Sequence, residues 1–254
     1  MTDLSKHPTN RFSGLAEIYA KSRPSYPAEA VSYIVERCRL SKGSTLIDIG
    51  SGTGISSRLF ASQGLTVTGI EPNDDMRTQA EREDSEIKTL TYKKGSAEKT
   101  GVESSVADAV LCAQAFHWFE PASALAEFKR ILKPGGWVVL IWNERDEKDA
   151  FTKCYGDLLR QLPETASVEV PRGLAGQALL DCEEYHDRQL RHFTNSQVMD
   201  EEGLIGRAFS ASYAPKDEAT AKEFTTSLRK LFAQFAKQDR VSLIYETSVY
   251  SASK

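Results

Sequence analysis

The sequence has few cysteines and places them far apart. Only four of its 254 residues are cysteine, and no CxxC pair occurs among them: Cys38, Cys112, Cys154 and Cys182. A structural zinc site needs closely spaced thiols, and a disulfide framework needs many of them. We therefore expect no metal site and no disulfide framework. Free thiols fit a cytoplasmic protein.

The chain also lacks an excess of basic charge and a long apolar run. Its formal net charge is −4, so the broad positive footprint of a nucleic-acid-binding protein is missing. No stretch approaches the roughly 20 apolar residues that cross a bilayer. Residues 1–14 are polar and lack the apolar core of a secretory signal. We expect no membrane span and no nucleic-acid partner, while the oligomeric state stays open.

Apolar runs alternate with helical patterns along the chain. Some runs, such as residues 137–142, are apolar throughout, which is typical of strands covered on both faces. Their alternation with helices predicts an α/β fold with a doubly wound, mostly parallel, seven-stranded sheet. The expected strands are residues 45–49, 65–70, 87–93, 107–112, 137–142, 190–198 and 241–250.

Helices are expected between most of these strands. Pro27 suits the first turn of one helix, and Asn73 is a plausible N-cap for another. The segment Lys-Pro-Gly-Gly at 133–136 predicts a turn, and residues 163–175 are expected to form a loop. Further helices are expected at residues 55–64, 121–132, 151–162 and 218–237.

Three glycines at alternate positions follow the first expected strand. Gly50, Gly52 and Gly54 lie where open α/β sheets bind their ligands, at the carboxyl end of a strand. Glycine lets the backbone approach a ligand closely, although a tight turn uses it too. Glu71 follows Gly50 by 71 − 50 = 21 residues, a separation at which an acid can accept hydrogen bonds from a ribose. The pattern therefore predicts a ligand that contains ribose.

The glycine spacing bears on which ribose ligand is bound. The dinucleotide fingerprint G-x-G-x-x-G requires a glycine at its sixth position, where this chain has Ile55. That difference favours a smaller nucleoside ligand over NAD. An NAD-linked oxidoreductase is the disfavoured alternative.

Five segments together resemble a known family. They are "LIDIGSGTG" (46–54), "GIEPNDDMRTQA" (69–80), "KKGSAE" (93–98), "DAVLCAQAFHWF" (108–119) and "EFKRILKPGGWVVLIWN" (127–143). In this order and spacing they resemble the class I S-adenosylmethionine-dependent methyltransferases, and more closely the type 11 branch, which includes trans-aconitate and quinone-pathway methyltransferases. The resemblance is specific over residues 44–143, looser over 12–43 and weak beyond 145.

The resemblance implies a single Rossmann-like methyltransferase domain over residues 1–254. Its parts are an N-terminal helical lid (1–43), a cofactor-binding core (44–143) and a variable region on the substrate side (144–254). The implied cofactor is S-adenosylmethionine. The residues implied to bind it are Tyr19, Arg23, Asp48, Gly50, Ser51, Gly52, Gly54, Glu71, Pro72, Asn73, Met76, Ser96, Ala97, Glu98, Gln114 and Ala115.

By the same resemblance, each group of these residues has a role. The glycines lie under the methionine and ribose parts, and Glu71 binds the ribose diol. Pro72, Asn73 and Met76 border the adenosine. Residues 96–98 contact the adenine, with Ser96 in a position where the family often has aspartate. Asp48 and Gln114 lie near the methionine end. Tyr19 and Arg23 close over the methionine carboxylate.

Catalytic candidates follow from the segments beside the reactive methyl group. His117 could act as a general base or anchor the acceptor, because a histidine pKa near neutrality suits proton removal. Asn143 follows the fifth expected strand and should face the same cleft. Phe116 and Trp118 are expected to be pocket walls or core. By resemblance to trans-aconitate-like relatives, the candidates for acceptor contacts are Arg207, Ser210 and Tyr213.

These features predict an enzyme that transfers a methyl group in line to an O, N, S or C atom of a small-molecule acceptor, for example a carboxylate or a phenol. A carboxylate acceptor needs no base, whereas a phenol would benefit from one such as His117. Two alternatives remain open: a protein that binds S-adenosylmethionine without turnover, and a methyltransferase that acts on RNA or protein.

Overall fold

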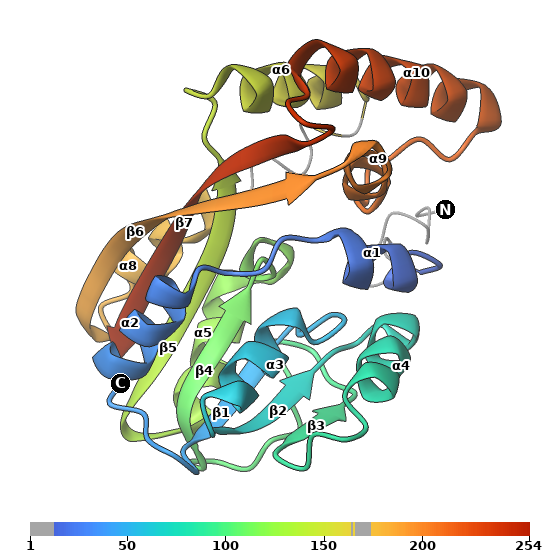
Figure 1. Ribbon diagram of the computed structural model, residues 1–254. Helices are drawn as coiled ribbons and strands as arrows, with labels where there is room; N and C mark the ends of the chain where they lie inside the picture. Colours follow the sequence, from blue (N-terminus) through green and yellow to red (C-terminus); the bar gives the residue numbers. More distant parts are fainter. Residues whose placement is uncertain (1–12, 164, 166–173) are drawn as a thin grey trace.

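A seven-stranded sheet forms the centre of the computed structural model, which describes residues 13–163, 165 and 174–254 (Figure 1). The strand order is β3-β2-β1-β4-β5-β7-β6. β7 runs antiparallel to both neighbours, and all other adjacent strands are parallel, which confirms the predicted sheet. The strands are β1 Thr45–Ile49, β2 Thr66–Ile70, β3 Leu90–Lys93, β4 Ala107–Ala113, β5 Leu132–Arg145, β6 His186–Met199 and β7 Val241–Ser253.

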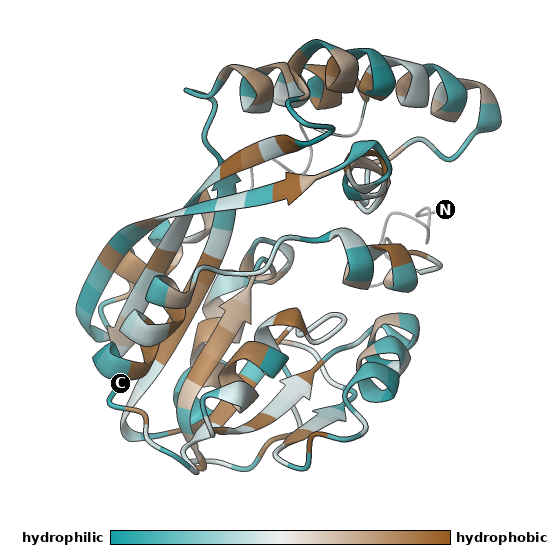
Figure 2. Ribbon diagram, viewed as in Figure 1, coloured by the Kyte–Doolittle hydropathy of each residue, from teal (hydrophilic) through white to brown (hydrophobic). Residues whose placement is uncertain are grey.

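Helices cover both faces of the sheet. The core on one face joins the strands to α5 and α8, and the core on the other joins them to α2 and α3. Figure 2 shows hydrophobic residues along the inner strands and mixed colours on the helices. The helices are α1 Ala16–Ser22, α2 Ala28–Arg37, α3 Ile55–Ser62, α4 Asp74–Glu83, α5 Pro121–Ile131, α6 Ala150–Arg160, α8 Gln177–Asp181, α9 Glu201–Phe209 and α10 Glu218–Phe235.

A group of helices lies beyond the carboxyl ends of the strands, and we call α1, α6, α9 and α10 the helical cap (Figure 1). α6, α9 and α10 share a third apolar core with the ends of β6 and β7. α1 packs between this core and α4. The two long antiparallel strands therefore connect the sheet directly to the cap. None of the helices in the described ranges is both long enough and apolar enough to cross a bilayer.

Several helix ends lie where the sequence predicts them. Asn73 caps α4, because its side-chain oxygen accepts a hydrogen bond from the Met76 amide at 3.0 Å. α2 begins directly after Pro27, and α5 has Pro121 in its first turn. Local capping chemistry thus fixes the connections around the first half of the sheet.

The expected turn at residues 133–136 is part of β5 instead. Ala107 pairs with Leu132 and Ala109 with Trp137, so the extra residues of β5 form an irregularity in which Gly135 has a φ of +75°. The glycines therefore bend a strand rather than connect two elements. Two helices, α8 and α9, were not predicted from the sequence. Most of the loop expected at 163–175, and the first part of the expected lid, lie outside the described residues.

Candidate functional site

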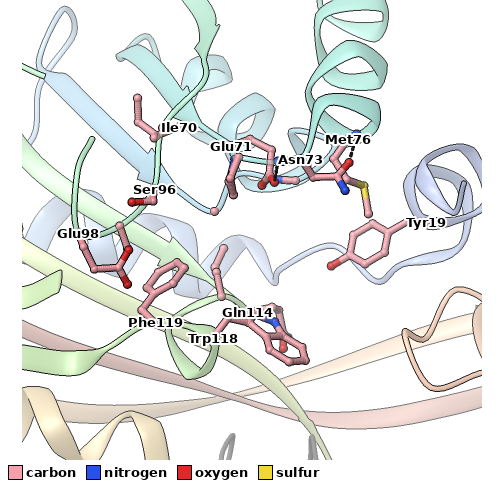
Figure 3. Close-up of a pocket in the computed structure, with 17 residues that line it drawn as sticks. Tyr19, Ile70, Glu71, Asn73, Met76, Ser96, Glu98, Gln114, Trp118 and Phe119 are labelled. Atoms are coloured by element: carbon pink, nitrogen blue, oxygen red, sulfur yellow. Dashed lines mark hydrogen bonds between the residues drawn. The ribbon is translucent and has the colours of Figure 1, made fainter. Parts of the chain in front are cut away.

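A cavity of about 350 Å³ lies at the carboxyl ends of β1, β2 and β4, where the glycine pattern predicts a ligand. Figure 3 shows Glu71 and Asn73 on one side, Gln114, Trp118 and Phe119 across from them, and Tyr19 at one end. Most of the predicted cofactor residues line this cavity: Tyr19, Gly50, Gly52, Glu71, Pro72, Asn73, Met76, Ser96, Ala97, Glu98, Gln114 and Ala115.

Glu71 is held in a fixed orientation at the end of β2. Its Oε2 accepts a hydrogen bond from the Gly52 amide at 2.9 Å, and its Oε1 accepts one from the Asn73 amide at 2.8 Å. The side chain is 7% exposed, and burial raises the pKa of its carboxyl above the ordinary value. Each oxygen keeps a second lone pair, so the carboxylate can accept two more hydrogen bonds from a ligand diol.

The first two glycines shape the floor of the cavity. Gly50 has a φ of +69°, and a Cβ there would lie 2.6 Å from the Cβ of Ala115. Gly52 has a φ of +56°, and a Cβ there would meet no described atom within 4 Å because it would point into open space. Gly50 thus keeps two loops close together, whereas Gly52 leaves room at the surface of the cavity.

The rim on the far side of Glu71 comes from the segment after β3. Ser96 accepts a hydrogen bond from the Lys99 amide at 3.2 Å, which closes a small turn around Ala97. Glu98 accepts one from the Glu120 amide at 3.1 Å and so joins this turn to the start of α5. Ser96, Ala97 and Glu98 line the main cavity, as does buried Met76.

Comparison with known proteins identifies the family. A model described as a methyltransferase domain matches residues 47–140, which span β1 to most of β5. An uncharacterized methyltransferase of Mycobacterium tuberculosis is 32% identical over 148 residues, 58% of this chain and 58% of that protein. The ubiquinone biosynthesis O-methyltransferase of Paraburkholderia xenovorans is 31% identical over 157 residues, 58% of this chain and 67% of that protein. The chain belongs to the class I S-adenosylmethionine-dependent methyltransferases.

A solved structure agrees with this fold. A protein from Anaeromyxobacter dehalogenans, described as a type II methyltransferase, superimposes with a TM-score of 0.68 at 20% identity. The match covers 91% of this chain and 97% of that one, so the likeness extends past β5 into the cap. The family's cofactor is S-adenosylmethionine.

Two predicted residues of this methyltransferase, Asp48 and Gly54, lie beneath the loop and are not among the residues that line the main cavity. Asp48 is fully buried, and its Oδ2 accepts hydrogen bonds from the hydroxyls of Ser56 and Ser57, each at 2.7 Å. Burial raises the pKa of Asp48 to about 6. Gly54, with a φ of +82°, packs against Tyr92 and Asp84. Both residues hold the loop onto α3 and its neighbours.

A second, smaller cavity of about 40 Å³ adjoins the first. Tyr19, Gly50, Gly52 and Gln114 line both, and Arg23, Ser51, Asn143 and Arg207 are among the residues that line only the second. Gln114 has a φ of +59° and donates a hydrogen bond from its side chain to the Asn143 carbonyl at 3.4 Å. The methyltransferase thus brings the end of β4, the end of β5 and the cap together at this point.

The two catalytic candidates are placed differently. Among the described residues His117 lines neither cavity; its Nδ1 lies 3.5 Å from Trp142 Nε1, which donates to it, and its ring packs on Trp118. Asn143 lines the second cavity, but its Oδ1 accepts from the Thr247 hydroxyl at 2.6 Å and its Nδ2 donates to the Ser25 carbonyl at 3.0 Å. Asn143 therefore ties β5 to β7 and to the segment before α2.

Of the acceptor candidates, Arg207 lines the second cavity, whereas Ser210 and Tyr213 line neither it nor the main cavity. The Ser210 hydroxyl donates to the Arg207 carbonyl at 2.8 Å, and Tyr213 packs against the core of the cap. The main cavity is also lined by four residues that were not predicted from the sequence: Phe119, Ile70, Gly95 and Ala113. Phe119 directly follows the "FHW" segment, and its aromatic side chain was the available signal.

Proposed function

We propose that this protein transfers the methyl group of S-adenosylmethionine to an oxygen atom of a small-molecule acceptor. The observation that carries the proposal is the Glu71 carboxylate, whose two oxygens are aligned by the amides of Gly52 and Asn73 and face the main cavity. Two aligned acceptors are suited to the two hydroxyls of a ribose. The family membership supports the same reading.

In this proposal the ribose lies at Glu71 and the adenine lies along residues 96–98, beside Met76. The methionine part then extends past Gly50 and Gly52 towards Gln114 and the second cavity. This orientation leaves Trp118 and Tyr19 around the transferred methyl group. The aromatic side chains would exclude water from the reacting atoms.

The reaction is an in-line displacement. An acceptor oxygen forms a bond to the methyl carbon while the carbon–sulfur bond breaks, and the electron pair of that bond stays on sulfur. The sulfonium is already activated, so the protein mainly aligns three atoms. Such alignment can lower the activation free energy by about 7–11 kcal/mol.

The surroundings favour a carboxylic acid over a phenol as the acceptor. The acids that line the main cavity are Glu71 and Glu98, both away from Gln114, and His117 lies outside it. A carboxylate loses no proton when it is methylated, so it requires no base. The P. xenovorans relative is named as an O-methyltransferase of ubiquinone biosynthesis, which supports transfer to oxygen within the type 11 branch.

Titration calorimetry with S-adenosylhomocysteine tests the cofactor assignment, followed by methyl-transfer assays on a panel of acids and phenols. We expect binding and turnover of an acid at a rate independent of pH above the acid's own pKa. Turnover of a phenol that rises with pH would contradict the carboxylate assignment. Binding without turnover on the panel would favour the non-catalytic alternative, and methylation of RNA or protein alone would reassign the acceptor.

A further inference from the structure

The second cavity brings together two arginines from distant parts of the chain. Arg23 follows α1, and Arg207 lies on α9, so they are 184 residues apart (207 − 23). Neither forms an ion pair with a carboxylate in the part of the chain that the structure describes. Their charges are therefore not balanced by the described residues around them.

Burial makes this arrangement costly. Arg207 is only 6% exposed, and its guanidinium has one hydrogen-bond partner among the described residues, the Tyr245 hydroxyl, 3.3 Å from Nε. Arg23 donates to the Ser210 carbonyl at 2.8 Å, while its Nε is buried with no partner within the described ranges. Burial and the nearby charge of Arg207 lower the pKa of Arg23. Two like charges in one buried cavity strongly favour an anion between them.

The opposite wall of the cavity also suits an anion. It consists of the glycine loop and the first turn of α3, with Ile55 and Ser56 at the positive end of the helix. Its N-cap residue is Gly54, which has no side chain to occupy the first amides. The volume of about 40 Å³ accommodates a small end group but not an entire acceptor molecule.

We propose that Arg207 and Arg23 together bind one carboxylate between the cap and the start of α3. This inference rests on the proposed function. The carboxylate belongs either to the methionine end of the cofactor or to the acceptor, because residues shared by the two cavities place it within reach of both. Since paired guanidinium groups reduce the nucleophilicity of a carboxylate, the group held here is not the one that receives the methyl.

Calorimetry on Arg207→Met separates the two sources. The probes are S-adenosylhomocysteine, which has the carboxylate, and 5′-methylthioadenosine, which lacks it. If the cofactor supplies the carboxylate, the variant binds S-adenosylhomocysteine about 10- to 100-fold more weakly, the range expected for lost charge-assisted hydrogen bonds. Its affinity for 5′-methylthioadenosine stays the same, which also shows that it is folded.

If the acceptor supplies the carboxylate, the two nucleosides bind the variant as they bind the wild type. Benzoate and citrate then bind the S-adenosylhomocysteine-loaded wild type and not the loaded variant. The matched control is Arg37→Met, which removes a guanidinium stacked on Trp137 at the other end of the sheet and should change none of these affinities.

Unchanged binding of all four probes in Arg207→Met and in Arg23→Met would overturn the inference while leaving the proposed function intact. Failure of the wild type to bind either nucleoside would instead contradict the proposed function. Selective loss of binding to S-adenosylhomocysteine, or to benzoate and citrate, supports the carboxylate site and identifies the source of the carboxylate.

Discussion

At the scale of single residues, the loop contains glycine at three positions for three different physical reasons. Gly50 avoids a clash with Ala115, Gly54 avoids one with Tyr92, and Gly52 borders open space. Only Gly52 both borders the main cavity and donates its amide to Glu71. The ligand-binding role predicted for all three therefore rests most directly on Gly52.

Gly52→Val should abolish cofactor binding while the protein stays folded. A valine side chain would enter the main cavity beside Glu71. The backbone φ of +56° at position 52 is also unfavourable for a β-branched residue. We expect the affinity for S-adenosylhomocysteine to fall by roughly 100-fold or more, or about 3 kcal/mol. Calorimetry measures the affinity, and urea unfolding measures the stability.

Gly43→Val is the matched control for this variant. Gly43 is exposed, has a φ of +87° and precedes β1 at the opposite end of the sheet; a Cβ there would also meet no described atom within 4 Å. It should lose a similar amount of stability and bind the cofactor normally. Normal affinity in Gly52→Val would show that the loop is only a turn. Reduced affinity in Gly43→Val would show that backbone strain, and not the cavity, lowers the affinity.

Asp48 makes the stability depend on pH in a specific direction. Its pKa rises from 3.8 to about 6 on burial, so the folded state holds the proton more tightly than the unfolded chain does. This contribution to stability is present below about pH 4 and is lost as the pH rises through about 6. Two pKa units correspond to roughly 2–3 kcal/mol.

Asp48→Asn should remove that dependence. Urea melts at pH 4, 5, 6 and 7 give the unfolding free energy of the wild type and of the variant. As the pH rises over this range, the wild type should lose stability relative to the variant. Glu71, Tyr92 and Cys112 also sense the charge of Asp48, but they are present in both proteins. A difference that is constant with pH would mean that Asp48 is not protonated in the folded protein.

At the scale of elements, the base of α3 depends on a polar cluster below the loop. Buried Asp84 accepts hydrogen bonds from the Tyr92 hydroxyl and from Arg58. A Cβ on Gly54 would lie 2.1 Å from that hydroxyl oxygen. The third glycine thus allows α3, α4 and β3 to meet at one point.

Gly54→Ala should cost about 2–4 kcal/mol of unfolding free energy, through overpacking and its positive φ. Tyr92→Phe alone should cost about 1 kcal/mol for the lost hydrogen bond. The double variant should lose less unfolding free energy than the sum of the two single losses, by about 1 kcal/mol or more, because the clashing hydroxyl is absent. Strictly additive values in urea unfolding would place the conflict elsewhere.

The sequence predicts elements best where burial is simplest. β1, β2, β4 and β5 are covered on both faces, so their apolar runs are unambiguous. α8 has only five residues, and α9 begins within a polar segment after the exposed strand β6, so neither gives a strong periodic signal. The bulged start of β5 was also missed, since proline and glycine normally indicate a turn.

In the candidate site, too, features that follow from a simple local pattern could be predicted and the others could not. Spacing along adjacent parallel strands brings Glu71 near Gly52, and this could be predicted from the sequence. Phe116–Trp118 form a short 3₁₀ helix, and the direction of each side chain within it could not be predicted from the sequence. The sequence therefore did not show that Trp118 lines the main cavity while its neighbour His117 does not. The meeting of Arg23 with Arg207 depends on how the cap folds back, which no local pattern encodes.

At the scale of the whole molecule, the cap and the sheet share two long strands. β6 and β7 contribute to the sheet at one end and to the core of the cap at the other. α9 presents Arg207 to the second cavity, and α1 contacts α9. A ligand that contacts both the glycine loop and α9 should therefore stabilise the cap against local opening.

Hydrogen exchange can measure this coupling. With S-adenosylhomocysteine at 100 times its Kd, opening that requires ligand release becomes unfavourable by about 2.7 kcal/mol, so the amides of α9 should exchange up to about 100-fold more slowly. Arg207→Met should reduce this protection if the cofactor supplies the carboxylate. α5 packs on one face of the sheet and outside the cap, so it serves as the internal reference. Equal protection of α9 with and without ligand would mean that the cap opens independently of the cofactor site.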